Sequence, residues 1–157
     1  MFPIFVDAAT RLADDISGLH VVIPAANAQC RDAIERITAN ASPTLALRIL
    51  DGEAQRAMIA SDGVLLASGT AELEAMLCKR PMVVGHRIAP LTDRIVKLCG
   101  LLKSECVSLP NVLAGQALIP ELLQDACTAD NLHVALLHWF RDADAVAALQ
   151  PRFLAIH

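Results

Sequence analysis

Short runs of apolar residues alternate with helical segments along this chain, and this alternation restricts the folds open to it. The runs lie at residues 18–25, 44–50, 63–67 and 81–85, and they are rich in valine, isoleucine and leucine. Strands that are apolar throughout, rather than at every second residue, are typical of a parallel sheet covered on both faces. The pattern predicts an α/β fold with a doubly wound, Rossmann-like parallel sheet.

Apolar residues at helical spacing fill most of the remaining chain. Helices are expected at residues 4–17, 27–40, 53–61, 70–78, 91–102, 118–127, 131–142 and 144–156. Pro151 is expected to kink or split the last of them. A fifth strand, running into a loop, is expected at residues 105–111. Trp139 is expected to pack in the core rather than to bind a ligand.

Length, composition and charge disfavour several classes of protein. The 157 residues suffice for one domain or at most two, and a hydrophobic fraction of 55% supplies a large core. No apolar run reaches the roughly 18 residues of a spanning helix, and the first residues lack the basic region of a signal peptide. The net charge of −4 argues against nucleic-acid binding. The five cysteines are scattered, which disfavours a disulfide framework or a zinc site.

The loop after residues 63–67 has the residues of a phosphate site. Ligands of doubly wound sheets bind beyond the carboxyl ends of the strands. Ser68 and Thr70 offer hydroxyl groups there, Gly69 allows close approach to the backbone, and the next helix offers free N–H groups. Glu74 lies one helical turn beyond Thr70 and can accept hydrogen bonds from ribose hydroxyls. An ordinary helix cap accounts for the same residues, so both interpretations stay open.

Three further segments follow expected strands. The turn Leu50-Asp51-Gly52 exposes backbone groups that can bind the edge of a base, or it is simply a turn. Arg87 can face a diphosphate, or it is a solvated cation. The amide of Asn111 can reach a polar ligand, although an asparagine after a proline often only forms a turn.

The motifs ASGTAELE, MVVG and SLPNVLAG, in this order and spacing, resemble the lipid-A-disaccharide synthases, most strongly over residues 50–87 and 107–127. That resemblance implies a glycosyltransferase of GT-B architecture, built from two facing Rossmann-like domains. Such enzymes transfer diacylglucosamine from UDP-2,3-diacylglucosamine to 2,3-diacylglucosamine 1-phosphate, which gives the β-1,6 lipid A disaccharide and UDP. No metal or other cofactor is implied. The implied location is cytoplasmic and peripheral to the inner membrane.

By this resemblance, residues 1–157 are the C-terminal, UDP-sugar-binding domain, truncated at both ends. The resemblance assigns the diphosphate to Ser68, Gly69 and Thr70, the ribose to Glu74, the uracil to Leu50, Asp51 and Gly52, and a place near the donor to Asn111. The catalytic base and the surface for the lipid acceptor are expected in an N-terminal domain that this chain lacks, so the chain alone is expected to be inactive. Two alternatives remain: an inactive nucleotide-binding or assembly fragment, and another UDP-N-acetylhexosamine enzyme of GT-B fold.

One departure from the family has a structural consequence. Members have a strand, ending in a Pro-Gly-Ser-Arg loop, before the helix at residues 4–17, and this chain begins without it. In a sheet of order 3-2-1-4-5-6 that strand is central. Its absence leaves the strands at residues 20–25 and 63–67 each with an unpaired edge. The sequence therefore predicts a gap or rearranged pairing between them, or a chain of poor stability.

Overall fold

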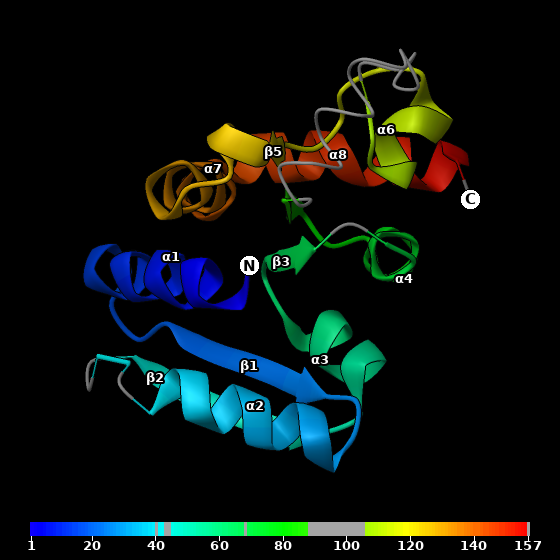
Figure 1. The fold of residues 1–157 in the computed structure, drawn as a ribbon. Helices are drawn as coiled ribbons and strands as arrows, with labels where there is room; N and C mark the ends of the chain where they lie inside the picture. The colour runs from blue at the N-terminus through cyan, green and yellow to red at the C-terminus, as the bar shows by residue number, and fades with distance from the viewer. Residues whose placement is uncertain (40, 43–44, 68, 88–105, 157) are drawn as a thin grey trace.

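A computed structural model describes residues 1–39, 41–42, 45–67, 69–87 and 106–156 (Figure 1). Within them, every strand pair is parallel, and the strands form two sheets. The first contains β1 (His20–Ala25) and β2 (Ala46–Asp51); the second has the order β3 (Val64–Ala67), β4 (Met82–His86), β5 (Glu121–Leu123). The predicted α/β class with parallel strands is confirmed.

Helices connect and cover these strands. They are α1 (Phe2–Asp15), α2 (Ala28–Thr38), α3 (Ala54–Ala60), α4 (Ala71–Leu77), α6 (Leu109–Ala114), the 3-10 helix η1 (Gln124–Ala126), α7 (Ala129–Arg141) and α8 (Ala143–Ile156). Side chains cap three of them. The Asn27 side-chain oxygen accepts from the Cys30 N–H at 2.9 Å, the Thr128 hydroxyl accepts from the Asn131 N–H at 3.2 Å, and the Asp142 carboxylate accepts from the Ala145 N–H at 2.8 Å. No helix in the described part of the chain is long and apolar enough to cross a bilayer.

The hydrophobic core lies around β4. Met82, Val83 and Val84 are at most 1% exposed. Helices α1, α4, α7 and α8 supply most of the rest of the core cluster, which includes the fully buried Phe153, and Met58 of α3, Ile119 and Cys127 complete it. Trp139 is also buried, and its indole Nε1 donates to the Met82 carbonyl at 3.1 Å. The prediction that Trp139 packs in the core is confirmed.

Two predicted elements are wrong. The expected strand at residues 105–111 is absent from its described part; instead α6 begins at Leu109, after an extended Ser108 and with Pro110 in its first turn. The expected helix at residues 118–127 is instead β5 followed by η1. Pairing with β4 outweighs local helical spacing here, because the buried Val84 donates its N–H to the Pro120 carbonyl.

The last helix runs without a break from Ala143 to Ile156, so of the two predicted effects of Pro151, a kink or a split, the split is absent. Leu149 and Phe153 are buried on either side of the proline and hold both halves against the core. Pro151 itself is exposed, which leaves the carbonyl one turn earlier free to bind water. The helix expected at residues 91–102 lies outside the described residues.

The predicted gap in the sheet is confirmed. Strands β1 and β3 belong to different sheets, and within the described residues no ladder joins them. Figure 1 shows β1 and β3 pointing the same way on either side of the break. A cavity of about 800 Å³ lies there, between residues of β1, β3, α1 and α3.

Candidate functional site

The strand registers bring several loops to one edge of the molecule. Ala25 is opposite Asp51 at the ends of β1 and β2, and Ala67 is opposite Gly85 in the second sheet. The loops that follow these strands therefore leave from the same side, on the right in Figure 1. This is the edge at which open α/β sheets bind ligands.

The loop between β3 and α4 is exposed and has special backbone geometry. Gly69 has a φ of 150°, in the range that favours glycine. Thr70 is the N-cap of α4, but its hydroxyl makes no capping hydrogen bond and remains exposed. Glu74, one turn further, is also exposed. These groups are accessible to a ligand, whereas Ser68 lies outside the described residues.

Glu72 holds this loop from behind, a role that the sequence did not reveal. Its side chain is 1% exposed. One carboxylate oxygen accepts from the Gly69 N–H at 3.0 Å, and the other accepts from the Leu109 N–H at 2.8 Å, at the start of α6. A glutamate in the first turn of a helix that accepts from an N–H group just before the helix resembles half of a capping box. The position of Glu72, three residues after Gly69, is the sequence feature that could have predicted this contact. Glu72 thus fixes the β3–α4 loop relative to α6.

The half-buried carboxylate of Glu121 and the buried Asn111 hold the start of α6. Asn111 donates from Nδ2 to the Ile119 carbonyl at 2.9 Å and to Glu121 at 2.6 Å, and its Oδ1 accepts from the N–H groups of Leu118 and Ile119 at 2.7 and 3.0 Å. Glu121 also accepts from the Val107 N–H at 2.8 Å. Because an amide offers two donors and two acceptor sites, these contacts occupy the Asn111 side chain fully. They favour a supporting role for Asn111 over direct ligand contact.

The turn after β2 is fixed by its own contacts. The Gly52 N–H donates to the Ala25 carbonyl at 2.7 Å, and Gly52 has a φ of 70°. Asp51 is exposed and pairs with Arg31 of α2 at 2.7 Å. The hydrogen bond that Arg31 donates to the Asp51 carboxylate raises the pKa of Arg31 further above its already high value. Leu50 lines the cavity between the sheets.

Arg87 directly follows β4. It is exposed, and its Nε donates to the Gln124 carbonyl at 3.0 Å. The pKa of the nearby buried Cys127 thiol is raised by burial, against a lowering effect of the Arg87 charge. A glycine is required at position 85, two residues before Arg87, because a Cβ atom there would lie 2.9 Å from the Phe5 ring.

Since Arg87 is exposed directly after β4, it adds a cation at the ligand-binding edge of the sheets.

The residues predicted to bind a nucleotide sugar follow strands: Gly52 comes after β2, Gly69 and Thr70 come after β3, and Arg87 comes after β4. Among the described residues, no group of three or more histidine, cysteine, aspartate or glutamate side chains is arranged to hold a metal ion.

The family model for lipid-A-disaccharide synthetase matches residues 1–150. The chain belongs to this family. A lipid-A-disaccharide synthase of Xanthomonas axonopodis pv. citri (strain 306) is 55% identical over 98% of this chain and 35% of its own length. One from Xylella fastidiosa (strain M12) is 53% identical over 98% of this chain and 40% of its own length. The chain thus spans little more than a third of these relatives, and the predicted family is confirmed.

Proposed function

We propose that this chain is the donor-binding part of a lipid-A-disaccharide synthase. In the proposed reaction, the anomeric carbon of UDP-2,3-diacylglucosamine is attacked by 2,3-diacylglucosamine 1-phosphate, UDP leaves, and a β-1,6-linked disaccharide forms. The match of residues 1–150 to the family model is the observation that carries this proposal. The catalytic base and the acceptor surface are assigned to parts of the enzyme outside this chain.

The proposed position of UDP follows the ends of the strands. The diphosphate lies over Gly69 and Thr70, with Ser68, where the uncapped Thr70 hydroxyl can donate to its oxygens. Arg87 faces the same diphosphate as a cation. Negative charge grows on the departing UDP during transfer, so donors held in place beforehand stabilise the transition state more than the ground state.

The nucleoside is proposed to extend from this point. The exposed Glu74 carboxylate accepts hydrogen bonds from the ribose hydroxyls, and the backbone of the Leu50-Asp51-Gly52 turn binds the edge of the uracil. Glu72 contributes indirectly, because its bonds to Gly69 and Leu109 fix the loop that receives the diphosphate. Asn111 acts in the same supporting way at the start of α6.

The proposed setting is the cytoplasmic face of the inner membrane, with the enzyme attached peripherally. Both substrates carry acyl chains, so a transferase that acts on them has to approach a lipid surface. The acceptor and membrane contacts are assigned to the remainder of the enzyme.

Calorimetric titration of the chain with UDP tests the proposal. Glu74→Gln is expected to weaken UDP binding by roughly 10- to 100-fold, since hydrogen bonds to charged groups contribute about 1.5–3 kcal/mol. Asp14→Asn is the matched control, because Asp14 is an exposed carboxylate near the end of α1, which leads to the amino end of β1. Absence of UDP binding by the unaltered chain at millimolar concentration would leave only the alternative of an inactive assembly fragment.

A further inference from the structure

Arg87 leaves the second sheet at the end of its middle strand. Strand β4 pairs with β3 on one side and with β5 on the other. His86, the last residue of β4, is opposite Leu123, the last residue of β5. Arg87 and Gln124 come next on these two strands, so they leave the sheet side by side. The β3–α4 loop, with Gly69, leaves from the other side of β4.

One hydrogen bond orients the Arg87 side chain. Its Nε donates to the backbone carbonyl of Gln124 at 3.0 Å. A guanidinium group is planar and carries five N–H groups, so a bond at Nε restricts the plane and leaves four N–H groups on the two terminal nitrogens. These terminal nitrogens make no hydrogen bond to any residue that the structure describes. They form the fork that binds two phosphate oxygens at once.

The charge of Arg87 differs from that of other arginines near the same edge. Arg31 pairs with Asp51 at 2.7 Å, and Arg56 pairs with Glu53 at 2.9 Å. Arg87 instead contacts a neutral carbonyl, and in the described part of the chain it forms no ion pair with a carboxylate. Its positive charge is therefore available to an anion.

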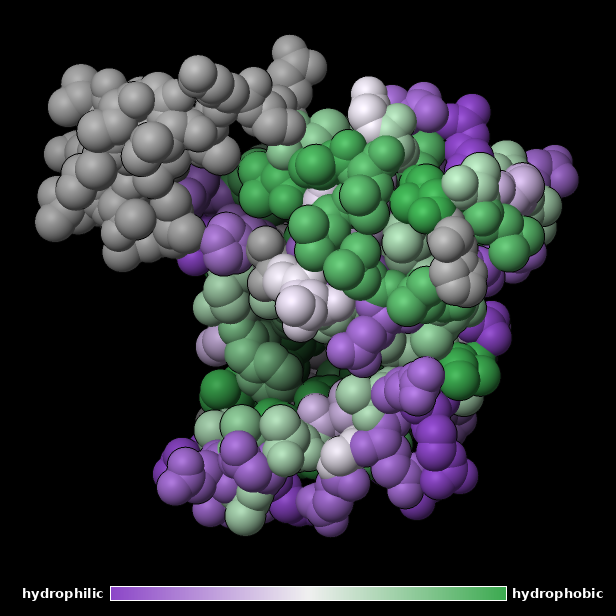
Figure 2. Space-filling view, turned by 90° about the vertical axis from the view of Figure 1, so that its right-hand side faces the viewer, coloured by the Kyte–Doolittle hydropathy of each residue, from purple (hydrophilic) through white to green (hydrophobic). Residues whose placement is uncertain are grey.

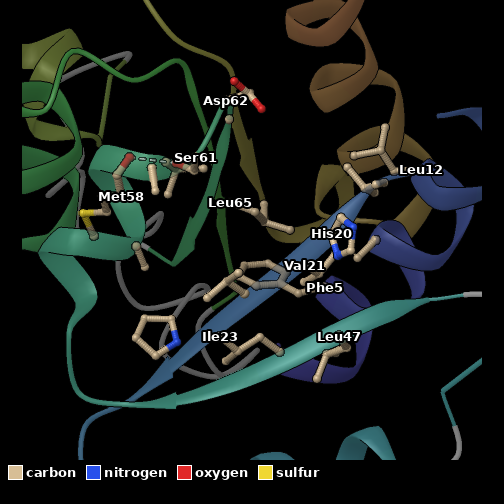
Figure 3. Close-up of a pocket in the computed structure, with 18 of the residues that line it drawn as sticks. Phe5, Leu12, His20, Val21, Ile23, Leu47, Met58, Ser61, Asp62 and Leu65 are labelled. Atoms are coloured by element: carbon tan, nitrogen blue, oxygen red, sulfur yellow. Dashed lines mark hydrogen bonds between the residues drawn. The ribbon is translucent and has the colours of Figure 1, made fainter. Parts of the chain in front are cut away.

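The cavity between the sheets is a poor place for a diphosphate. Figure 3 shows Val21 and Ile23 of β1, Leu65 of β3 and Phe5 of α1 around it. Figure 2 faces the ligand-binding edge and shows a hollow between the upper and lower parts of the molecule, with apolar residues deep inside it. A charged group among apolar side chains is costly unless it is paired. The exposed Arg87 is the better partner for a diphosphate.

Gln124 presents its carbonyl to Arg87 through an unusual backbone conformation. Its φ of 49° lies in the left-handed region, which favours glycine and asparagine over glutamine. The same carbonyl accepts from the Cys127 N–H at 3.1 Å, which uses its second acceptor site. Cys127 is fully buried, and its Sγ lies 3.1 Å from the place that a Cβ of Gly85 would take. The turn after β5 is thus anchored against the end of β4.

We propose that Gln124 is a positioning residue for the recognition of a nucleoside diphosphate, a role that rests on the proposed function. Its backbone carbonyl holds the Arg87 guanidinium so that the terminal N–H groups face the diphosphate. A flexible arginine loses rotamer freedom when it binds an anion. The bond to Gln124 removes part of that freedom before the ligand arrives, and such preorganisation strengthens binding without a further contact. Strained backbone residues of this kind persist where the surrounding structure holds them, and they gather at binding sites.

Calorimetric titrations with UDP and uridine test this role, because only UDP carries the diphosphate. Arg87→Ala is expected to weaken UDP binding roughly 10- to 100-fold, through loss of charge-assisted hydrogen bonds. Gln124→Val introduces a β-branched residue, which disfavours a positive φ. It is expected to weaken UDP binding roughly 3- to 10-fold, the cost of ordering one flexible side chain on binding. Uridine binding should change less than about twofold in both variants, and Gln124→Val should add no loss to Arg87→Ala.

Two further variants separate positioning from stability. Gln124→Gly keeps the carbonyl and readily adopts a positive φ, so it should restore UDP affinity to within about twofold. Lys79→Val is the matched control, because Lys79 has a φ of 58° and lies at the opposite, amino end of β4. It should lower stability as Gln124→Val does, yet leave the ratio of UDP to uridine affinity unchanged. By NMR, the Arg87 Nε–H should exchange with water more slowly in the unaltered chain than in Gln124→Val, a readout that needs no ligand.

Several outcomes would overturn the role of Gln124 while the nucleotide site stands. They are equal UDP affinities of Gln124→Val and the unaltered chain, equal losses for Gln124→Val and Lys79→Val, and a loss for Gln124→Gly as large as that for Gln124→Val. A loss in Gln124→Val that persists in the Arg87→Ala background would equally overturn it, since the effect would then not pass through Arg87.

Inorganic pyrophosphate separates this role from the proposed function. If the chain binds pyrophosphate through Arg87 but binds no uridine, the nucleoside assignment fails and the role of Gln124 stands, provided that Gln124→Val weakens pyrophosphate binding. Binding of neither UDP nor pyrophosphate would overturn both proposals.

Discussion

The two sheets of this chain are built from similar apolar strands, yet they differ sharply in burial. In the β3–β4–β5 sheet, Met82, Val83 and Val84 are almost completely inaccessible. In the β1–β2 sheet, only Ala25 is buried, and the neighbouring helix α2 has no buried residue. Among the described residues, the core cluster draws nothing from β1, β2 or α2.

The difference shows that an apolar strand is not buried by its own composition. Helices α1, α4, α7 and α8 supply most of the core around the β3–β4–β5 sheet, whereas β1 faces a cavity along the edge away from β2. Burial of apolar surface is the main favourable term in folding. We therefore expect the free energy of unfolding to depend mainly on the β3–β4–β5 part of the molecule.

The largest predicted effect concerns α8. Phe153→Ala is expected to lower the free energy of unfolding by about 3–5 kcal/mol, because it removes a fully buried ring and leaves a cavity. Urea denaturation measures this. Leu154→Ala is the control, since the adjacent Leu154 is 60% exposed and should change stability by less than about 0.5 kcal/mol. Equal losses for the two variants would contradict the placement of the core.

A smaller loss of unfolding free energy is expected for a change at Glu72, the buried carboxylate of α4. Glu72→Gln is expected to cost about 1.5–3 kcal/mol, because the amide group turns a donor toward the N–H of Gly69 or Leu109. Glu74→Gln, two residues away and exposed, is expected to leave the free energy of unfolding within about 0.5 kcal/mol. If both variants unfold at the same urea concentration as the unaltered chain, Glu72 does not hold the loop.

The same substitution of one valine in each sheet compares the contributions of the two sheets to stability. Val84→Ala in β4 is expected to cost about 2 kcal/mol, from two buried carbon atoms and the cavity they leave. Val22→Ala in β1, where the side chain is 43% exposed, is expected to cost about 0.5 kcal/mol or less. The thermal unfolding temperatures of the two variants show which substitution costs more stability. A larger loss at Val22 would reverse the comparison between the sheets.

The smallest predicted effect is the pH dependence of folding stability that arises from the buried Cys127. Burial raises the pKa of Cys127 in the folded chain, whereas the unfolded thiol ionises from about pH 8.5. The stabilising contribution of the neutral thiol is therefore complete below that pH, and it declines as pH rises toward the raised pKa of the folded chain. Cys127→Ala should remove this decline, and Cys30→Ala, at an exposed position on α2, should keep it. Identical pH profiles of the two variants would exclude Cys127 as the source.

Local sequence predicts most of this fold but not its long-range polar contacts. The four apolar runs and the helices between them follow from composition and spacing alone. Strand β5 and helix α6 do not, because their positions depend on β4 and on Glu121, whose carboxylate binds the Val107 N–H 14 residues away. The bond from Glu72 to Leu109 spans 37 residues, so spacing within one helix cannot reveal it.

In the candidate site, too, local sequence predicts some features and long-range contacts determine others. Its loops were predictable because parallel strands of any sequence place their carboxyl ends at one edge. The supporting role favoured for Asn111 was not, since it rests on bonds to Leu118, Ile119 and Glu121 that form only when β5 has paired.

The most direct test of the proposed function is to map UDP onto the chain by NMR. Isotope-labelled chain is titrated with UDP, and backbone amide shifts are followed. The account predicts saturable changes at Gly52, Gly69, Thr70 and Glu74, with none at Asp14. Changes confined to other parts of the chain, or no saturable change at millimolar UDP, would contradict the assignment of a nucleotide-sugar site to this edge of the sheets.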